Sequence, residues 1–276
     1  MYIYLIFTIL KSPKLQKVIN MLGYHLSAID PFPHEKLYAR PSKYEDLTYS
    51  ETPIGKYYLP KTCKNDWIVN CMRNGVLFDE VIINAAKRYI KEDTVVLDLG
   101  ANFGQMTIEF SKYVGKNGMV YSFEAQKYVY DILVKNIEVN CQSQVYTFYN
   151  AVYDIDNKTV KFPTVDLSKD MTLGCFGLNP KLDEGTEVTT ITIDSLKIQQ
   201  PISFIKCDIQ GSDIFALRGA RETIKRHKMP IIFEFEQEFQ DQFHTTFQDY
   251  VDFVQSINYK FVENINYSNY LIMPKY

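Results

Sequence analysis

The stretch Val95-Val96-Leu97-Asp98-Leu99-Gly100-Ala101-Asn102-Phe103-Gly104 decides the fold of this chain. Its first half is a short apolar run, which is typical of a buried parallel strand. Two glycines then bracket a turn, and residues 105–110 begin a helical pattern. A strand, a glycine turn and a helix in this order predict a ligand site over the N-terminus of the helix.

The second feature is Glu124, which ends the next apolar run, residues 118–123. An acid at the tip of the second strand is well placed to accept hydrogen bonds from both hydroxyls of a ribose. The dinucleotide pattern G-x-G-x-x-G fails in either register around Gly100, and a pyrophosphate would gain nothing from the Asp98 carboxylate. S-adenosylmethionine suits the pair better, with its ammonium and sulfonium charges near Asp98 and its ribose on Glu124. An ordinary α/β turn with two glycines remains the alternative.

Composition sets limits on the partners. The chain of 276 residues is long enough for one large α/β domain with an extension. Its 30 basic and 33 acidic residues give a net charge of −3, which argues against a nucleic-acid partner, because such proteins usually carry a basic stripe. The five cysteines are odd in number and form no C-x-x-C pair, so we expect reduced thiols in a cytoplasmic protein.

The N-terminal part, residues 1–90, lacks the alternation of strands and helices predicted for the rest of the chain. Residues 1–10 are apolar, but a membrane span takes about 20 residues, and no signal-peptide features accompany them. We expect a packed element or an oligomer contact, as in a homodimer, rather than a membrane-associated segment. Residues 52–60 read as a hairpin or edge strand, and residues 66–90 read as helical with a break near Asn74-Gly75. Residues 1–90 are therefore predicted to be a largely helical N-terminal extension.

From Thr94 onward, strands alternate with helices, the pattern of a mostly parallel sheet. Parallel strands are expected at 95–99, 119–124, 145–152, 202–208 and 230–236, with helices at 103–114, 127–140, 213–228 and 243–257. The runs 259–265 and 270–273 complete a seven-stranded sheet as a C-terminal antiparallel hairpin. Residues 153–194 interrupt the alternation and are predicted to be an inserted ribbon with a mobile tip. The domain is thus predicted to span residues 91–276.

Acidic residues gather where the chemistry is expected. Ligands bind at the carboxyl ends of the strands of an open α/β sheet, and four of the five parallel strands end in acids with no lysine cluster nearby to pair them. Asp208 and Glu234 could also serve only to cap or pair a neighbouring group. Together with His244 in the polar loop 237–245, they are the candidates for a base that removes the proton of an acceptor hydroxyl.

An ordered set of motifs between about residues 52 and 236 resembles the FkbM-type S-adenosylmethionine-dependent methyltransferases. The matching segments are T-P-I-G-K (52–56), V-L-D-L-G-A-N-F-G (96–104), S-F-E-A (122–125), Asn136, Asn140, N-A-V (150–152), T-I-D-S-L (192–196), F-I-K-C-D-I-Q-G (204–211) and L-R-G-A (217–220). Two positions depart from the family's pattern: Ala125 replaces a usual Pro, and Gln210 replaces a usual Glu. An amide cannot take a proton or balance a cation as a carboxylate does.

The resemblance implies a Rossmann-like class I methyltransferase fold and O-methylation of a hydroxyl on a sugar or glycan precursor. A lipid, polyketide or peptide acceptor, or a non-catalytic binding protein that keeps the cofactor fold, are the alternatives. No metal is expected. The residues implied at the cofactor are Asp98, Gly100, Ala101, Asn102, Phe103, Gly104, Glu124, Ala125, Asn150 and Ala151.

The acceptor side is expected to involve Gln210 and the insertion. The tip of the insertion, residues 168–184, is polar and contains several glycine and proline residues. Such a segment is too long for a simple connection, so we predict a lid that closes over a hydroxylated acceptor, with Asp170 on the substrate side. A surface ribbon without a role in the site is the alternative.

Overall fold

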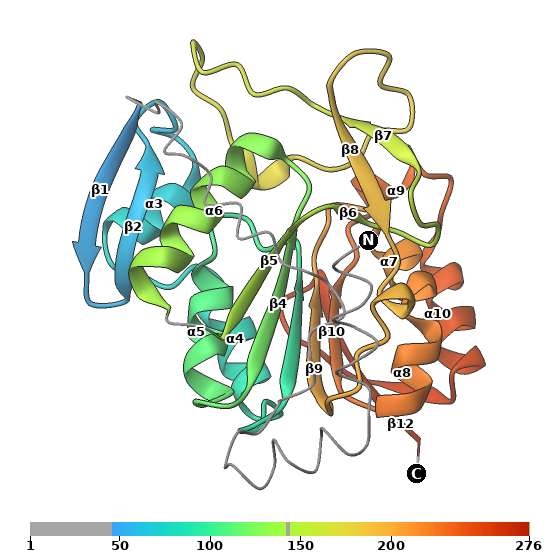
Figure 1. The fold of residues 1–276 in the computed structure, drawn as a ribbon. Helices are drawn as coiled ribbons and strands as arrows, with labels where there is room; N and C mark the ends of the chain where they lie inside the picture. Colours follow the sequence, from blue (N-terminus) through green and yellow to red (C-terminus); the bar gives the residue numbers. More distant parts are fainter. Residues whose placement is uncertain (1–45, 142–143, 276) are drawn as a thin grey trace, which may run out of the picture. The chain divides into compact units, whose positions relative to one another are not determined.

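The computed structural model describes residues 46–141 and 144–275 (Figure 1). A seven-stranded sheet forms its centre, in the order β11-β12-β10-β9-β3-β4-β5. The five strands from β10 to β5 are parallel, whereas β12 is antiparallel to both β10 and β11. The predicted seven-stranded sheet with an antiparallel C-terminal hairpin is confirmed. The strands are β3 (Val95–Leu99), β4 (Met119–Glu124), β5 (Val145–Tyr149), β9 (Ile202–Cys207), β10 (Ile231–Glu234), β11 (Tyr259–Asn264) and β12 (Asn269–Pro274).

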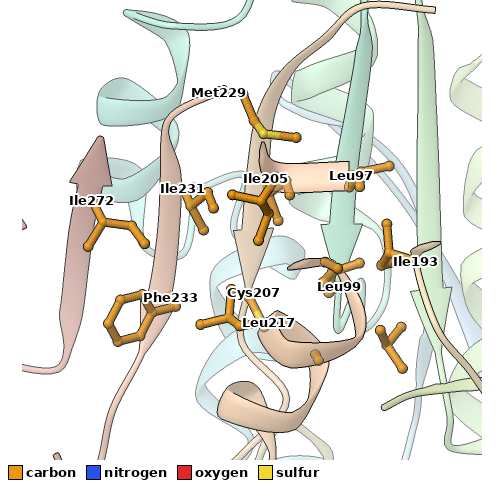
Figure 2. Close-up of a cluster of buried hydrophobic side chains, with 14 of the residues drawn as sticks. Leu97, Leu99, Ile193, Ile205, Cys207, Leu217, Met229, Ile231, Phe233 and Ile272 are labelled. Atoms are coloured by element: carbon orange, nitrogen blue, oxygen red, sulfur yellow. The ribbon is translucent and has the colours of Figure 1, made fainter. Parts of the chain in front are cut away.

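Helices cover both faces of this sheet, so its central strands are buried on both sides. One face packs against α7, α8 and α10, with Leu97, Leu99, Ile205, Cys207 and Phe233 among the side chains between them (Figure 2). The other face packs against α4 and α5. The predicted helix 213–228 is divided at Ala220, and the predicted helix 243–257 is preceded by a separate turn of helix. The helices are α4 (Glu80–Lys87), α5 (Gln105–Tyr113), α7 (Asp213–Gly219), α8 (Arg221–His227), α9 (Gln237–Gln240) and α10 (Phe247–Ser256).

The alternation of side chains along a strand places three charged residues on one face. Val96, Phe204 and Ile232 pack against α4 and α5. Asp98, Lys206 and Glu234 each lie two residues further along the same strands, so they lie on that same face. Asp98 and Lys206 are direct partners in the β3–β9 register. The pleat therefore brings these charges together near the carboxyl ends of the strands.

The described part of the predicted N-terminal extension is a hairpin followed by helices. Strands β1 (Leu47–Thr52) and β2 (Gly55–Pro60) pair, and α3 (Trp67–Arg73) packs with them against α6 (Lys127–Asn140). The buried Asn136 amide accepts from Tyr58 N–H at 2.6 Å and donates to the Phe103 carbonyl at 2.8 Å. Asn140 accepts from Lys56 N–H at 2.8 Å. These two asparagines of the family pattern thus hold the hairpin to the domain.

The insertion differs from its prediction in one respect. The chain leaves the main sheet after Tyr149, and β6 (Ala151–Val152) joins β8 (Thr186–Ile191) and β7 (Thr159–Phe162) in a separate sheet. Where the chain leaves the main sheet, the Asn150 amide donates to the Thr189 carbonyl of β8 at 3.0 Å, a contact between residues 39 positions apart. Pairing of β6 with β8 is parallel, and only β7 with β8 is antiparallel as a ribbon would be.

Some of the predictions concern parts of the chain at or beyond these limits. The apolar run 1–10 lies outside the described residues, and the division at residue 90 stays a prediction. Among the residues that the structure describes, no helix is long and apolar enough to cross a membrane. The five cysteines, all of them described, are free thiols.

Candidate functional site

A cavity of about 900 Å³ opens at the carboxyl ends of β3, β4 and β9. Its wall contains most of the predicted site residues: Gly100, Ala101, Asn102, Phe103, Glu124, Ala125, Asn150, Ala151, Asp208 and Gln210. Five predicted residues are not in this wall: Asp98, Gly104, Asp170, Glu234 and His244.

The turn after β3 is shaped by contacts with the neighbouring strands. Gly100 has φ +83°, and a Cβ there would lie 1.9 Å from the Asp208 carbonyl oxygen, so only glycine fits. The N–H groups of Gly100 and Ala101 both donate to the Phe123 carbonyl, at 3.0 and 2.9 Å. Because these donors are already used within the protein, the turn does not offer them to a phosphate. This arrangement agrees with a ligand that lacks a pyrophosphate.

Glu124 is fixed by the backbone around it. Its Oε2 accepts from Asn102 N–H at 3.0 Å, and its Oε1 accepts from Gln126 N–H at 2.8 Å. Each carboxylate oxygen keeps a further lone pair for a ligand hydroxyl. Burial raises the pKa of Glu124 to about 7, against the opposing effect of these backbone hydrogen bonds. The residue is therefore an oriented hydrogen-bond acceptor whose charge changes near neutral pH.

Asp98 lies beneath the cavity rather than in its wall. The side chain is fully buried and accepts a hydrogen bond from the Thr107 hydroxyl. Its Oδ1 lies 3.8 Å from Lys206 Nζ, and that ammonium donates to the Gly100 carbonyl at 2.9 Å. Burial, only partly offset by Lys206, raises the pKa of Asp98. Asp98 therefore reaches the glycine turn through Lys206, and its predicted direct contact with the cofactor stays a prediction.

Three side chains form a hydrogen-bonded group beside Lys206. The Gln210 Nε2 atom lies 2.9 Å from Asp208 Oδ1 and 2.9 Å from Glu234 Oε2. Although burial opposes it, the Lys206 ammonium, 3.4 Å from Asp208 Oδ2, lowers the pKa of Asp208. Burial and the negative Asp208 raise the pKa of Glu234 to about 11. At neutral pH the pair thus holds an ionised Asp208 and a protonated Glu234.

The other two predicted residues lie away from this group. His244 is exposed on the loop before α10, in the left-handed conformation with φ +53°, and does not contribute to the cavity wall. Asp170 accepts from the N–H groups of Lys64 and Asn65, at 2.9 and 3.3 Å, and from the Asn65 side-chain amide at 2.6 Å. Asp170 therefore ties the insertion to the segment before α3, and nothing in its position brings it to an acceptor.

The predicted lid, residues 168–184, contributes the roof of the cavity. Leu173, Gly174, Phe176 and Leu178 line it, opposite the strand ends. Gly177 passes so close to the turn after β9 that a Cβ there would lie 2.7 Å from the Gln210 carbonyl oxygen. A second tie comes from the buried Asp66, which caps α3 through Val69 N–H at 2.9 Å and accepts from Leu173 N–H at 2.7 Å.

Two of these residues carried signals that the sequence interpretation missed. Lys206 is the one charged residue of the buried strand β9, and a buried lysine needs an acidic partner. The sequence shows no lysine cluster that could pair the acids, and in the structure a single lysine contacts both Asp98 and Asp208. Asp66 stands before the first residue of α3, which predicts a cap, but its bond to Leu173 spans 107 positions and has no local signal.

One family profile matches more than half of the chain. The profile of the "Methyltransferase FkbM domain" family matches residues 98–261, and no curated protein is significantly similar to the sequence. Solved structures with a similar fold include methyltransferase FkbM from Methylobacillus flagellatus KT, with 16% identity, a TM-score of 0.43, and 69% of this chain and 49% of that one covered. A SAM-dependent methyltransferase from Aquifex aeolicus has 15% identity, a TM-score of 0.41, and coverages of 71% and 88%. An rRNA methylase from Streptococcus thermophilus has 10% identity, a TM-score of 0.41, and coverages of 70% and 92%.

Proposed function

Because the chain belongs to the FkbM methyltransferase family, we propose that it is an O-methyltransferase that transfers the methyl group of S-adenosylmethionine to a hydroxyl of a sugar or glycan precursor. The observation that carries the proposal is the ionised Asp208, which reaches the wall of the same cavity as Glu124. A donor site and a base for the acceptor are thus combined in one cavity.

The donor side of the cavity fits the methyl donor. Glu124 is the hydrogen-bond acceptor for the ribose hydroxyls, and the turn 100–103 together with Asn150 and Ala151 lines the same wall. The turn keeps no free row of N–H groups for a phosphate, which suits a donor with an amino-acid tail. S-adenosylmethionine, when bound, supplies an activated methyl group on a sulfonium.

The side of the cavity that takes the methyl acceptor supplies the base. An acceptor hydroxyl forms its new O–C bond as the C–S bond breaks, and its proton passes to the Asp208 carboxylate. Lys206 keeps Asp208 ionised for this step, and the protonated Glu234 cannot compete for the proton. A base in this position typically contributes about 10²–10⁴-fold to the rate.

The acceptor class is inferred from the two walls that face each other. The floor offers Asp208, Gln210 and Ser212, and the roof offers the apolar Phe176 and Leu178. A ring with hydroxyls on one side and C–H groups on the other matches both walls. The net charge of −3 supports a small or glycan acceptor over a nucleic acid, and the free thiols support a cytoplasmic site.

The test is methyl transfer from labelled S-adenosylmethionine to panels of sugars, nucleotide-sugars, lipids and peptides, with calorimetry of S-adenosylhomocysteine binding alongside. We expect turnover on the sugar panel, and a fall of about 10²–10⁴-fold in Asp208→Asn with cofactor affinity nearly unchanged. A fully active Asp208→Asn would refute its role as the base. Turnover on lipids or peptides alone would move the acceptor to the alternative class, and the lack of any cofactor binding would end the proposal.

A further inference from the structure

Gln210, which stands where the family usually has Glu, hydrogen-bonds two carboxyl groups and so affects their protonation. An amide nitrogen carries two hydrogens, so it can donate to Asp208 and to Glu234 at once, and both distances are 2.9 Å. If position 210 held a third carboxyl, Asp208 and Glu234 would each face another acid instead of the amide donor. The side chain is therefore turned inward as a bridge between the two acids.

The backbone holds Gln210 in this position at a cost. Gln210 has φ +55° and Gly211 has φ +91°, so two successive residues adopt the left-handed conformation. For a residue other than glycine this conformation is uncommon and persists where the surroundings enforce it. Here Asp213 enforces it, because its carboxylate accepts from the N–H groups of Ile209 at 3.3 Å and Gly211 at 3.2 Å.

The charges around the pair explain why a neutral donor is needed. Glu234 and Asp208 are themselves joined by a side-chain hydrogen bond. Among the residues that the structure describes, Lys206 is the one cation in salt-bridge contact with the pair, while acids approach from several elements. The groups that act electrostatically on this pair are Lys206 on β9, Asp98 on β3, Asp79 before α4, Asp213 on α7, Glu236 after β10 and Cys175 in the lid.

We propose that Gln210 is a positioning residue that limits the Asp208–Glu234 pair to a single shared proton and so keeps Asp208 available as the base. It does so by donating to both carboxyls without adding a negative charge. The identification of Asp208 as the base rests on the proposed function, whereas the shared proton is a property of the protein alone. Gln210 thus adapts the site instead of marking a loss of activity.

The decisive variants are Gln210→Glu and Gln210→Met. The first adds a third carboxyl, and the second removes both donors without a change of charge. Either change disfavours ionised Asp208. We therefore expect the midpoint of its titration to rise by about 1–2 pH units, the equivalent of one charge-assisted hydrogen bond. The matched control is Gln248→Glu, which makes the same charge change at an exposed position on α10.

The measurement is a ¹³C NMR titration of the side-chain carboxyls in protein labelled at Asp and Glu, without any acceptor. The upward shift in both Gln210 variants, absent in Gln248→Glu, is the expected result. Superimposable titrations of the wild type and the Gln210 variants would overturn the proposal. The acid limb of the pH–rate profile should move by the same amount. A protein that binds no S-adenosylhomocysteine would refute the proposed function and leave the titration result intact, so the two failures are distinguishable.

Discussion

Lys206 Nζ lies 3.4 Å from Asp208 Oδ2. Lys206 is the last residue but one of β9, and Asp208 comes directly after the strand. The same ammonium lies 3.8 Å from the fully buried Asp98. The Lys206 ammonium is therefore the counter-charge of two carboxylates, one beneath the cavity and one in its wall. Because both acids depend on it, the lysine links the stability of the domain to the ionisation of the candidate base.

Replacing Lys206 by Met should cost about 3–5 kcal/mol in the free energy of unfolding, because it leaves Asp98 buried without its counter-charge. Urea denaturation at neutral pH measures the loss. The double variant Lys206→Met/Asp98→Asn should recover part of it, since the amide carries no charge to be buried. Strictly additive effects of the two substitutions would contradict the pairing.

Replacing Glu124 by Ala should weaken S-adenosylhomocysteine binding by about 1.5–3 kcal/mol, or about 10–150-fold in Kd, the size of a lost charge-assisted hydrogen bond. Calorimetry measures it. An unchanged Kd would refute the ribose role.

The raised pKa of Glu124, about 7, adds a pH dependence to cofactor binding. The free protein carries Glu124 mostly protonated below that pH, and the ribose hydroxyls favour its ionised form. Affinity should therefore be full above about pH 7 and fall by up to tenfold for each pH unit below it. The slope should be reduced in Glu124→Gln, whose side chain does not titrate; an equal slope in both proteins would assign the effect to another group.

The lid should depend on the tie that Asp170 makes to Lys64 and Asn65. We expect Asp170→Ala to raise the KM for the acceptor several-fold while the Kd of S-adenosylhomocysteine stays nearly constant, because the roof loses one of its two anchors to the segment before α3. Replacing residues 168–184 with a short Gly-Ser linker should have a larger effect in the same direction. Asp183→Ala is the matched control, an exposed acid of the same segment outside the tie. Unchanged acceptor kinetics in the linker variant would show that the segment is not a lid.

Gly100→Ala should destabilise the domain by about 2–6 kcal/mol, the sum of left-handed strain and overpacking against the Asp208 carbonyl. Gly115→Ala is the comparison, since Gly115 has a similar φ of +72° but its nearest neighbour, Glu92 Cγ, would lie 3.5 Å from a Cβ. Urea denaturation of both variants separates strain from crowding. Equal losses would show that the close approach to Asp208 contributes nothing.

The sequence by itself determined the fold and one wall of the cavity. The alternation of apolar strands and helices predicts the sheet, because the period of the side chains along a chain is a local property. The turn 100–104 follows the end of β3 and Glu124 is the last residue of β4, and the ends of parallel strands meet at one edge of a sheet. Local pattern was therefore sufficient to predict the cavity wall from Gly100 to Phe103 together with Glu124.

The tertiary structure alone decided which charged groups meet. The order β10-β9-β3 brings Lys206 beside Asp98 and Glu234 beside Asp208, and the path of the insertion sends Asp170 to Asn65 instead of the cavity. His244 was a plausible base by type, yet its loop leaves it exposed. These contacts join residues far apart along the chain, and they depend on strand order, loop path and the depth of burial, which no local pattern encodes.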